Sequence, residues 1–338
     1  MNTSNHVQIR KSKFNLVVSL PDCVAIYNTL QDSITLVKSH PSELRKTELD
    51  LLHKQGVLVN QGIDENMVFR CRAGRQKFNS SRLHLFLTIT GKCNCDCQYC
   101  FAKGCFPNHS MNLEDVDIVL GFLSRELRSR SFKEIAVDLF GGEPLLCESI
   151  YLQVMRGVSV IAAQLGIVPS FQFYTNGTIR PQNGFATFSE FQAVKFLITL
   201  DGLRETHNML RPLIGNGSSY DLILRNLQEI REIGQQAIIR INYGKRNYKE
   251  VPLLLDELVR QGLTCFPIEF YPIQSMSKGS AEFENSVSCS DLQKIVGFLW
   301  EAATERGILI ATRPVSANCY CSAFTDTMFV IDPDLGNH

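Results

Sequence analysis

Five of the twelve cysteines in this 338-residue chain lie within thirteen consecutive positions. Cys93, Cys97 and Cys100 have the spacing C-x3-C-x2-C, and Cys95 and Cys105 accompany them. The N-terminus has no apolar signal segment, and clustered cysteines outside the secretory route are typical of metal or redox chemistry rather than of disulfides. The spacing leaves two interpretations open: a four-iron cluster held by three thiolates, or a zinc knuckle in which Cys95 supplies the fourth ligand.

The cysteine loop follows the first of about six alternating strand-like and helix-like segments between residues 83 and 307. Such alternation predicts a parallel sheet with right-handed crossovers. Six units are fewer than the eight of a closed barrel, and Pro267 in the last strand suits a sheet edge. We therefore predict an α/β fold with a partial (β/α)6 TIM-like barrel, in which sites gather at the carboxyl ends of the strands. The expected strands are 83–90, 135–139, 171–175, 196–200, 237–242 and 263–271.

The first 69 residues predict a separate small unit. Three strand-like segments before residue 38 precede a helix-like segment at 42–54, for which Ser42 is a candidate N-cap. This pattern indicates a winged-helix-like α+β unit. Residues 70–82 carry five basic side chains and no acidic one, so we expect a basic linker here, either solvated or facing an acidic partner.

The cysteine loop also resembles a known family. The run LTITGKCNCDCQYCF is similar to the cluster loop of the radical S-adenosylmethionine (SAM) enzymes, and Tyr99 holds the position of their aromatic residue before the last cysteine. The resemblance implies that Cys93, Cys97 and Cys100 hold a [4Fe-4S] cluster whose open iron binds SAM. It also implies reductive cleavage of SAM to a 5′-deoxyadenosyl radical, which takes a hydrogen atom from the substrate.

Three further segments match this family in order. They are DLFGGEP at 138–144, YTNGT at 174–178 and ITLDG at 198–202, the last with Thr in place of Ser and followed by His207 and Arg211. Alone, each is also explained by a tight turn, an Asn-Gly turn or a helix cap. The glutamate of the first segment is placed to pair with the SAM ammonium, and no catalytic base is identified. The resemblance assigns contacts with SAM to Tyr99, Gly141, Gly142, Glu143, Pro144, Thr175, Asn176, Gly177, Thr199 and Asp201.

Two cysteines near the end of the sequence, Cys319 and Cys321, resemble the start of the cysteine-rich SPASM or twitch extension of peptide-modifying members of the family. In that extension a glycine and a further cysteine follow the first cysteine, and Gly336 fits this glycine, whereas the next cysteine would fall just beyond the last residue given. We therefore expect the barrel over 83–313 and a truncated start of the extension over 314–338. Cys319 and Cys321 are candidate ligands of an auxiliary iron–sulfur cluster.

The N-terminal unit is similar to the leader-recognition elements of ribosomal-peptide maturases, which bind a leader by adding a strand to their sheet. The resemblance implies a maturase that forms a thioether or carbon–carbon crosslink in a precursor peptide. Its partners would be the peptide's leader and an electron donor of the flavodoxin or ferredoxin type. Two alternatives stay open: a sulfatase-maturase-type oxidase of protein side chains, and a non-catalytic peptide-binding protein with a zinc or vestigial cluster site.

Charge and hydropathy indicate which partners and which cellular location to expect. The chain has 34 basic and 34 acidic side chains, so we expect no nucleic-acid partner. It has no run of eighteen apolar residues, so we expect no membrane span. Together with the absence of a signal segment, this predicts a cytoplasmic protein.

Overall fold

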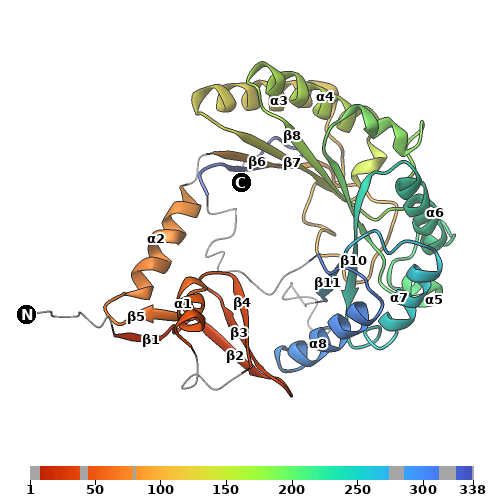
Figure 1. Cartoon of the computed structure of the whole chain (residues 1–338). Coiled ribbons are helices and arrows are strands. Elements are labelled where there is room, and N and C mark those ends of the chain that lie inside the picture. The colour runs from red at the N-terminus through yellow and green to blue at the C-terminus, as the bar shows by residue number, and fades with distance from the viewer. Residues whose placement is uncertain (1–7, 39–44, 79–80, 274–284, 312–324, 337–338) are drawn as a thin grey trace, which may run out of the picture. The chain divides into compact units, whose positions relative to one another are not determined.

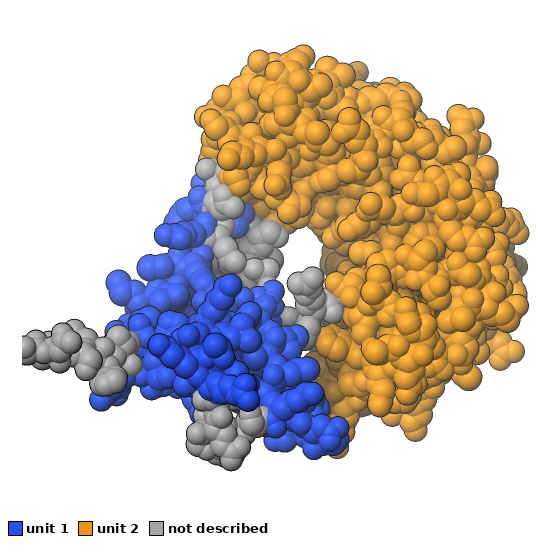
Figure 2. All heavy atoms as spheres, viewed as in Figure 1, with its two compact units in different colours: residues 1–79, 313–326 blue, residues 80–312, 327–338 orange. Residues whose placement is uncertain are grey.

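The structure is a computed structural model in which the chain divides into two compact units (Figure 2). Unit 1 comprises residues 1–79 and 313–326, and unit 2 comprises residues 80–312 and 327–338. The residues that the structure describes are 8–38, 45–78, 81–273, 285–311 and 325–336.

Unit 2 is built on one sheet of seven strands, and every pair of neighbouring strands in it is parallel. The strand order is β11-β10-β9-β8-β7-β6-β12. This confirms the predicted partial barrel of α/β type. The strands are β6 (Arg82–Thr90), β7 (Glu134–Gly141), β8 (Pro169–Thr175), β9 (Val194–Thr199), β10 (Gln236–Tyr243), β11 (Ile268–Pro272) and β12 (Met328–Ile331).

Helices lie along the convex side of this curved sheet (Figure 1). The alternation of side chains in a strand explains why: Leu83, Leu85 and Leu87 of β6 are fully buried, whereas His84 and Phe86 between them stay partly exposed on the other face. The apolar face is thus covered by helices and the mixed face lines the interior of the barrel. The helices are α3 (Leu113–Ser129), α4 (Glu148–Gln164), α5 (Arg204–Leu210), α6 (Ser219–Glu232), α7 (Val251–Arg260) and α8 (Cys289–Glu305), with short 3-10 helices η2 (Pro144–Leu146) and η3 (Phe185–Glu190).

Strand β12 is a seventh strand that the sequence did not predict. It pairs in parallel with residues 84–87 of β6, and the Phe329 ring packs edge-on against Phe122 of α3 at 5.0 Å between centroids. This corrects the expected assignment of all of 314–338 to a separate extension, because residues 328–331 complete the barrel sheet. Cys319 and Cys321 fall outside the described residues, so their role as auxiliary ligands stays a prediction.

The described residues of unit 1 form a three-stranded antiparallel sheet, a two-stranded sheet and two helices. Val37, Leu52 and Val57 form its small buried core, and Ile26 packs against them. The elements are β1 (Ile9–Lys11), β2 (Asn15–Ser19), β3 (Val24–Asn28), β4 (Ser33–Val37), α1 (Lys46–Lys54), β5 (Leu58–Asn60) and α2 (Glu65–Lys77). The candidate cap Ser42 lies outside the described residues, and Arg45 is the N-cap of α1.

Helix α2 replaces most of the basic linker that the sequence suggested for residues 70–82. The helix is anchored at Glu65, whose buried carboxylate accepts hydrogen bonds from Arg10 Nη1 at 2.6 Å and from the Ser12 hydroxyl. Along the same helix, Arg72 Nη2 donates to Gln31 Oε1 at 2.7 Å. A basic composition did not exclude a helix here, because arginine and lysine are good helix formers.

Candidate active site

The cysteine loop, residues 91–107, leaves the carboxyl end of β6 and is held by a distant part of the chain. Residues 210–214, called the strap below, come at the end of α5 and run antiparallel to the first half of the loop. This pairing fixes the backbone of the loop between Asn94 and Gln98. The hydrogen bonds join Asp96 N to Pro212 O (2.9 Å), Gln98 N to Leu210 O (3.1 Å) and Ile214 N to Asn94 O (2.9 Å).

Three thiols of this loop lie together. The Cys95 side chain hydrogen-bonds to the sulfurs of Cys93 and Cys97, and this lowers the pKa of both thiols. Cys93 Sγ also accepts from Cys95 N at 3.4 Å and from Asn176 Nδ2 at 3.7 Å. Cys100, the third predicted ligand, is exposed. Because thiolate is the form that binds metals, Cys93 and Cys97 lie in an environment that suits a metal-bound sulfur.

The glycine pair at the end of β7 allows that strand to touch the start of the cysteine loop. Gly142 N donates to Thr90 O, and Glu143 N donates to Lys92 O, both at 2.8 Å. A Cβ atom at position 142 would lie 2.3 Å from Lys92 O. Only glycine therefore permits this approach of two backbones. Pro144 follows as the first residue of η2.

Glu143 joins the ends of β7 and β8. Its side chain is fully buried and accepts from the Thr175 hydroxyl at 2.7 Å, from Asn176 N at 2.7 Å and from Leu145 N at 3.0 Å. Burial raises the pKa of this carboxyl to about 7 in spite of these three hydrogen bonds. The predicted pairing of Glu143 with the SAM ammonium stays a prediction, and within the protein its established partners are these donors.

The Asn-Gly turn after β8 reaches the cysteine loop. Asn176 Nδ2 donates to Asn94 Oδ1 at 2.8 Å as well as towards Cys93, and Asn176 Oδ1 accepts from Thr178 N at 2.9 Å. Gly177 has a φ of +76°, a left-handed conformation that glycine adopts at little cost. Thr199 ends β9 and is half-buried.

Tyr99 and Asp201 belong to a buried polar network. The Tyr99 hydroxyl donates to Asp201 Oδ2, and it accepts from Arg211 Nη1 at 2.8 Å and from Asn242 Nδ2 at 3.1 Å. Asp201 Oδ1 accepts from Asn242 N at 2.7 Å, and Asp201 N donates to His207 Nδ1 at 3.1 Å. These bonds connect the cysteine loop to the carboxyl ends of β9 and β10.

Asn247 closes this network beneath β10. Helix α7 begins only at Val251, and the buried Asn247 side chain donates to the carbonyls of Asp201 (2.6 Å) and Asn242 (2.9 Å). The roles of Asn94, Asn242 and Asn247 carried no sequence signal, since each depends on a contact between distant segments.

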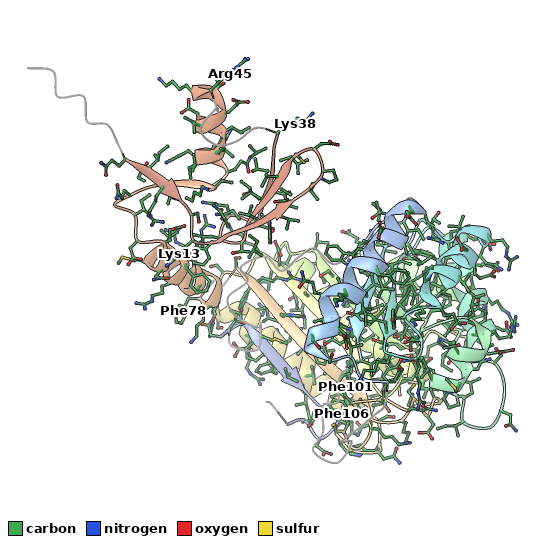
Figure 3. The ribbon with its side chains drawn as sticks, turned by 90° about the horizontal axis from the view of Figure 1, so that it is seen from below. Lys13, Lys38, Arg45, Phe78, Phe101 and Phe106 are labelled. Atoms are coloured by element: carbon green, nitrogen blue, oxygen red, sulfur yellow. The ribbon has the colours of Figure 1, made fainter. Side chains whose placement is uncertain are left out.

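Aromatic side chains line the interior of the barrel beside the cysteine loop. Phe140 of β7 contacts the rings of Phe86 and Tyr174 on the neighbouring strands, at 5.0 and 5.7 Å between centroids. Phe101 and Phe106 of the cysteine loop, which Figure 3 labels, also pack against Phe140, at 6.1 and 5.9 Å between centroids. These five half-buried or exposed rings form the aromatic wall.

The donor set of the loop fits an iron–sulfur cluster. Three cysteines offer soft sulfur ligands, two of them with lowered pKa values, and the buried Arg211 beside them has a nitrogen, Nε, without a hydrogen-bond partner among the described residues. In the part of the chain that the structure describes, no three His, Cys, Asp or Glu side chains are placed to hold a single metal ion. The assignment of Cys93, Cys97 and Cys100 as cluster ligands stays a prediction.

Solved structures share the fold of the partial parallel barrel. Native anSMEcpe with bound AdoMet matches with a TM-score of 0.63 and 16% identity, over 76% of this chain and 73% of that one. Streptococcus suis SuiB bound to S-adenosylmethionine matches with a TM-score of 0.55 and 16% identity, over 96% of this chain and 80% of that one.

The comparison with curated proteins also finds a relative. The Fe-coproporphyrin III synthase of Methanosarcina barkeri is 23% identical over 236 residues, which cover 68% of this chain and 55% of that protein. This chain thus spans about half the length of that relative. No protein-family model matches the chain. Among the described helices, none is long and apolar enough to cross a membrane.

Proposed function

We propose that this chain is a radical SAM enzyme that modifies a precursor peptide. The observation that carries the proposal is the meeting of three motifs at the cysteine loop. Asn176 approaches the sulfur of Cys93 from 83 positions along the chain, and Glu143 binds the Asn176 backbone while its own N–H bonds the loop. The meeting point lies at the carboxyl ends of β6, β7 and β8, where parallel sheets of this kind place their sites.

Each part of this site has a role in the proposal. Cys93, Cys97 and Cys100 would hold a [4Fe-4S] cluster, and the backbone at Gly141 and Gly142 would approach SAM closely. When bound, such a cluster supplies the electron that cleaves SAM, which is chemistry that no side chain provides. The chain's own residues bind and orient the cofactors and keep water away. A donor of the flavodoxin or ferredoxin type in the cytoplasm would return the electron.

The aromatic wall is the proposed position of the modified side chain. It borders the cysteine loop through Phe101 and Phe106 and continues on β6, β7 and β8. Farther along the sheet, the Arg240 guanidinium lies 5.1 Å from the Tyr271 ring centroid and donates to Glu269 at 2.8 Å. Half-buried rings and a paired charge suit a peptide segment with apolar and polar groups.

Unit 1 is the proposed binding element for the leader of the peptide. Strands β2 and β4 are the two edges of its sheet, and an edge strand can accept an added strand. The register places Leu16 and Ile34 on either side of Tyr27, and Val18 and Leu36 on either side of Ala25, so these side chains share one face. The four are 56–64% exposed. The solved structure of SuiB with its precursor peptide SuiA gives a precedent for a peptide partner in a protein of this fold.

We also propose the product of the reaction. A thioether or carbon–carbon crosslink is the favoured product, and oxidation of a side chain in a folding protein without a leader is the second candidate. The exposed apolar face of unit 1 favours the crosslink, because an enzyme that binds no leader does not need such a face to recognise its substrate. An Ile34→Asp variant should weaken binding of a precursor peptide at least tenfold if this face binds a leader, whereas Val160→Asp on an exposed position of α4 should not.

The experiment that tests the activity is anaerobic. The full chain is reconstituted with iron and sulfide, iron per chain is counted, and 5′-deoxyadenosine is assayed after dithionite and SAM are added. About four irons and nucleoside release support a radical SAM enzyme, and additional iron indicates an auxiliary cluster. Bound zinc without SAM cleavage would instead support the non-catalytic binding protein.

A further inference from the structure

Arg211 is a buried cation that has no role in the proposed reaction as described so far. Its side chain is 10% exposed, and it extends from the strap. Nη1 donates to the Tyr99 hydroxyl and lies 3.8 Å from Asp201 Oδ2, whereas Nε has no hydrogen-bond partner among the described residues. A buried guanidinium with an unpaired donor is costly unless further negative charge compensates it.

Arg211 is held next to the cysteine loop by the strap. The residues on either side of it in the strap, Leu210 and Pro212, bond directly to loop residues that flank Cys97. The guanidinium itself donates to Tyr99, which lies between Cys97 and Cys100 in the loop, so the cation lies beside the predicted ligands.

Tyr99 holds this cation in place. The Tyr99 hydroxyl donates one hydrogen bond and accepts two, which is the full number that a hydroxyl can make. Along the chain, Tyr99 lies two residues after Cys97 and directly before Cys100. The loop and the cation are thus fixed to the same atom. A displacement of Arg211 would release both Tyr99 and Asp201.

We propose that Arg211 is the positioning residue that holds the cysteine loop through Tyr99 and compensates the negative charge of the cluster, so that it sets the cluster's reduction potential. This inference rests on the proposed function, since it requires a [4Fe-4S] cluster. A cluster gains one negative charge on reduction, and a nearby fixed cation in a poorly solvated site favours the reduced form. Asp201 opposes this effect.

The test is a redox titration of the reconstituted full chain, followed by electron paramagnetic resonance, with iron counted in parallel. In Arg211→Met, the ratio of reduced to oxidised cluster at a fixed potential should fall about tenfold, which is a shift of ~59 mV for one electron. In Asp201→Asn, which keeps the shape of the side chain, the ratio should rise. Arg211→Lys keeps the charge and should stay near the wild-type ratio with weaker retention of iron.

The matched control is Arg204→Met, which removes an exposed arginine from the start of α5, the helix that leads into the strap. Its potential should equal that of the wild type. A purely structural role would shift the Arg211→Met and Asp201→Asn variants in the same direction or leave both unchanged, and either result would overturn the inference. If Arg211→Met does not fold, the ratio of reduced to oxidised cluster in Asp201→Asn still tests the inference: a rise supports it, and no rise overturns it. A wild-type chain that forms no [4Fe-4S] cluster refutes the proposed function itself, which is a separate outcome.

Discussion

Replacing Gly142 by alanine should break the contact between β7 and the cysteine loop. The added Cβ would lie 2.3 Å from Lys92 O, 2.5 Å from Lys92 C and 2.8 Å from Gly91 O. Protein Cβ atoms essentially never approach closer than 3.0 Å, so the two backbones must separate by about 0.7 Å. All three obstructing atoms belong to the main chain, and no side chain can rotate away to relieve the contact.

The separation would stretch two buried backbone hydrogen bonds, Gly142 N to Thr90 O and Glu143 N to Lys92 O, both now 2.8 Å long. Losing a buried hydrogen bond costs about 1–3 kcal/mol, so we expect the free energy of unfolding of unit 2 to fall by about 2–4 kcal/mol. The cysteine loop begins at this contact, so iron retention should fall as well.

The assay is urea unfolding followed by fluorescence of Trp300, the chain's single tryptophan, which lies in α8 of unit 2. Gly121→Ala is the matched control, because Gly121 lies inside α3 and its added Cβ would have only an ordinary contact at 3.8 Å. That variant should be stabilised by about 0.5–1 kcal/mol. A Gly142→Ala protein with wild-type stability and iron content would refute the steric reasoning.

Four further variants test other parts of the structure. Cys95→Ala should retain the iron of the reconstituted wild type, whereas Cys97→Ala should lose most of it; equal iron in the two would contradict the predicted ligand set. Burial raises the pKa of Glu65, but the hydrogen bonds from Ser12 and Arg10 outweigh this effect and hold the pKa below the ordinary 4.5. The ionised carboxylate therefore stabilises unit 1 above pH 4.5. This stabilisation is lost as the pH falls through the pKa of the folded protein. Glu65→Gln should destabilise unit 1 by about 1–3 kcal/mol at pH 7 and remove this pH dependence, as measured by hydrogen exchange of unit 1 amides. Tyr151 is fully buried and its hydroxyl has no hydrogen-bond partner among the described residues, so Tyr151→Phe should raise the free energy of unfolding by about 1 kcal/mol, and a loss of stability would reveal a missing partner.

The sequence predicted the features of this protein that depend on local patterns. The apolar alternation of Leu83, Leu85 and Leu87 and the helical spacing in α3 place strands and helices, and the cysteine spacing places the loop at a strand end. Features that depend on distant contacts were missed. The strap meets the cysteine loop from 112 residues away, as the bond between Arg211 and Tyr99 shows, and nothing near either residue indicates it.

Two other differences have a similar origin. The basic stretch beginning at Arg70 suggested a linker because charge was weighed above helix propensity, whereas the burial of Glu65 against the first strand decides that a helix starts there. Strand β12 has only four residues, and its assignment depends on pairing with β6 rather than on its own composition. Local patterns therefore predicted the strands and helices of the barrel, but not the contacts between distant segments that hold the cysteine loop.

The short β12 has a consequence for solubility. Exposed strand edges offer unpaired N–H and C=O groups to other molecules, and β6 would be such an edge without residues 328–331. At the other end of the sheet, β11 closes with Pro272, which has no N–H to offer. The strand that carries the cysteine loop is thus shielded from a second chain by a four-residue segment. Damage to that segment would appear first as aggregation of the protein, with the residues of the site themselves unchanged.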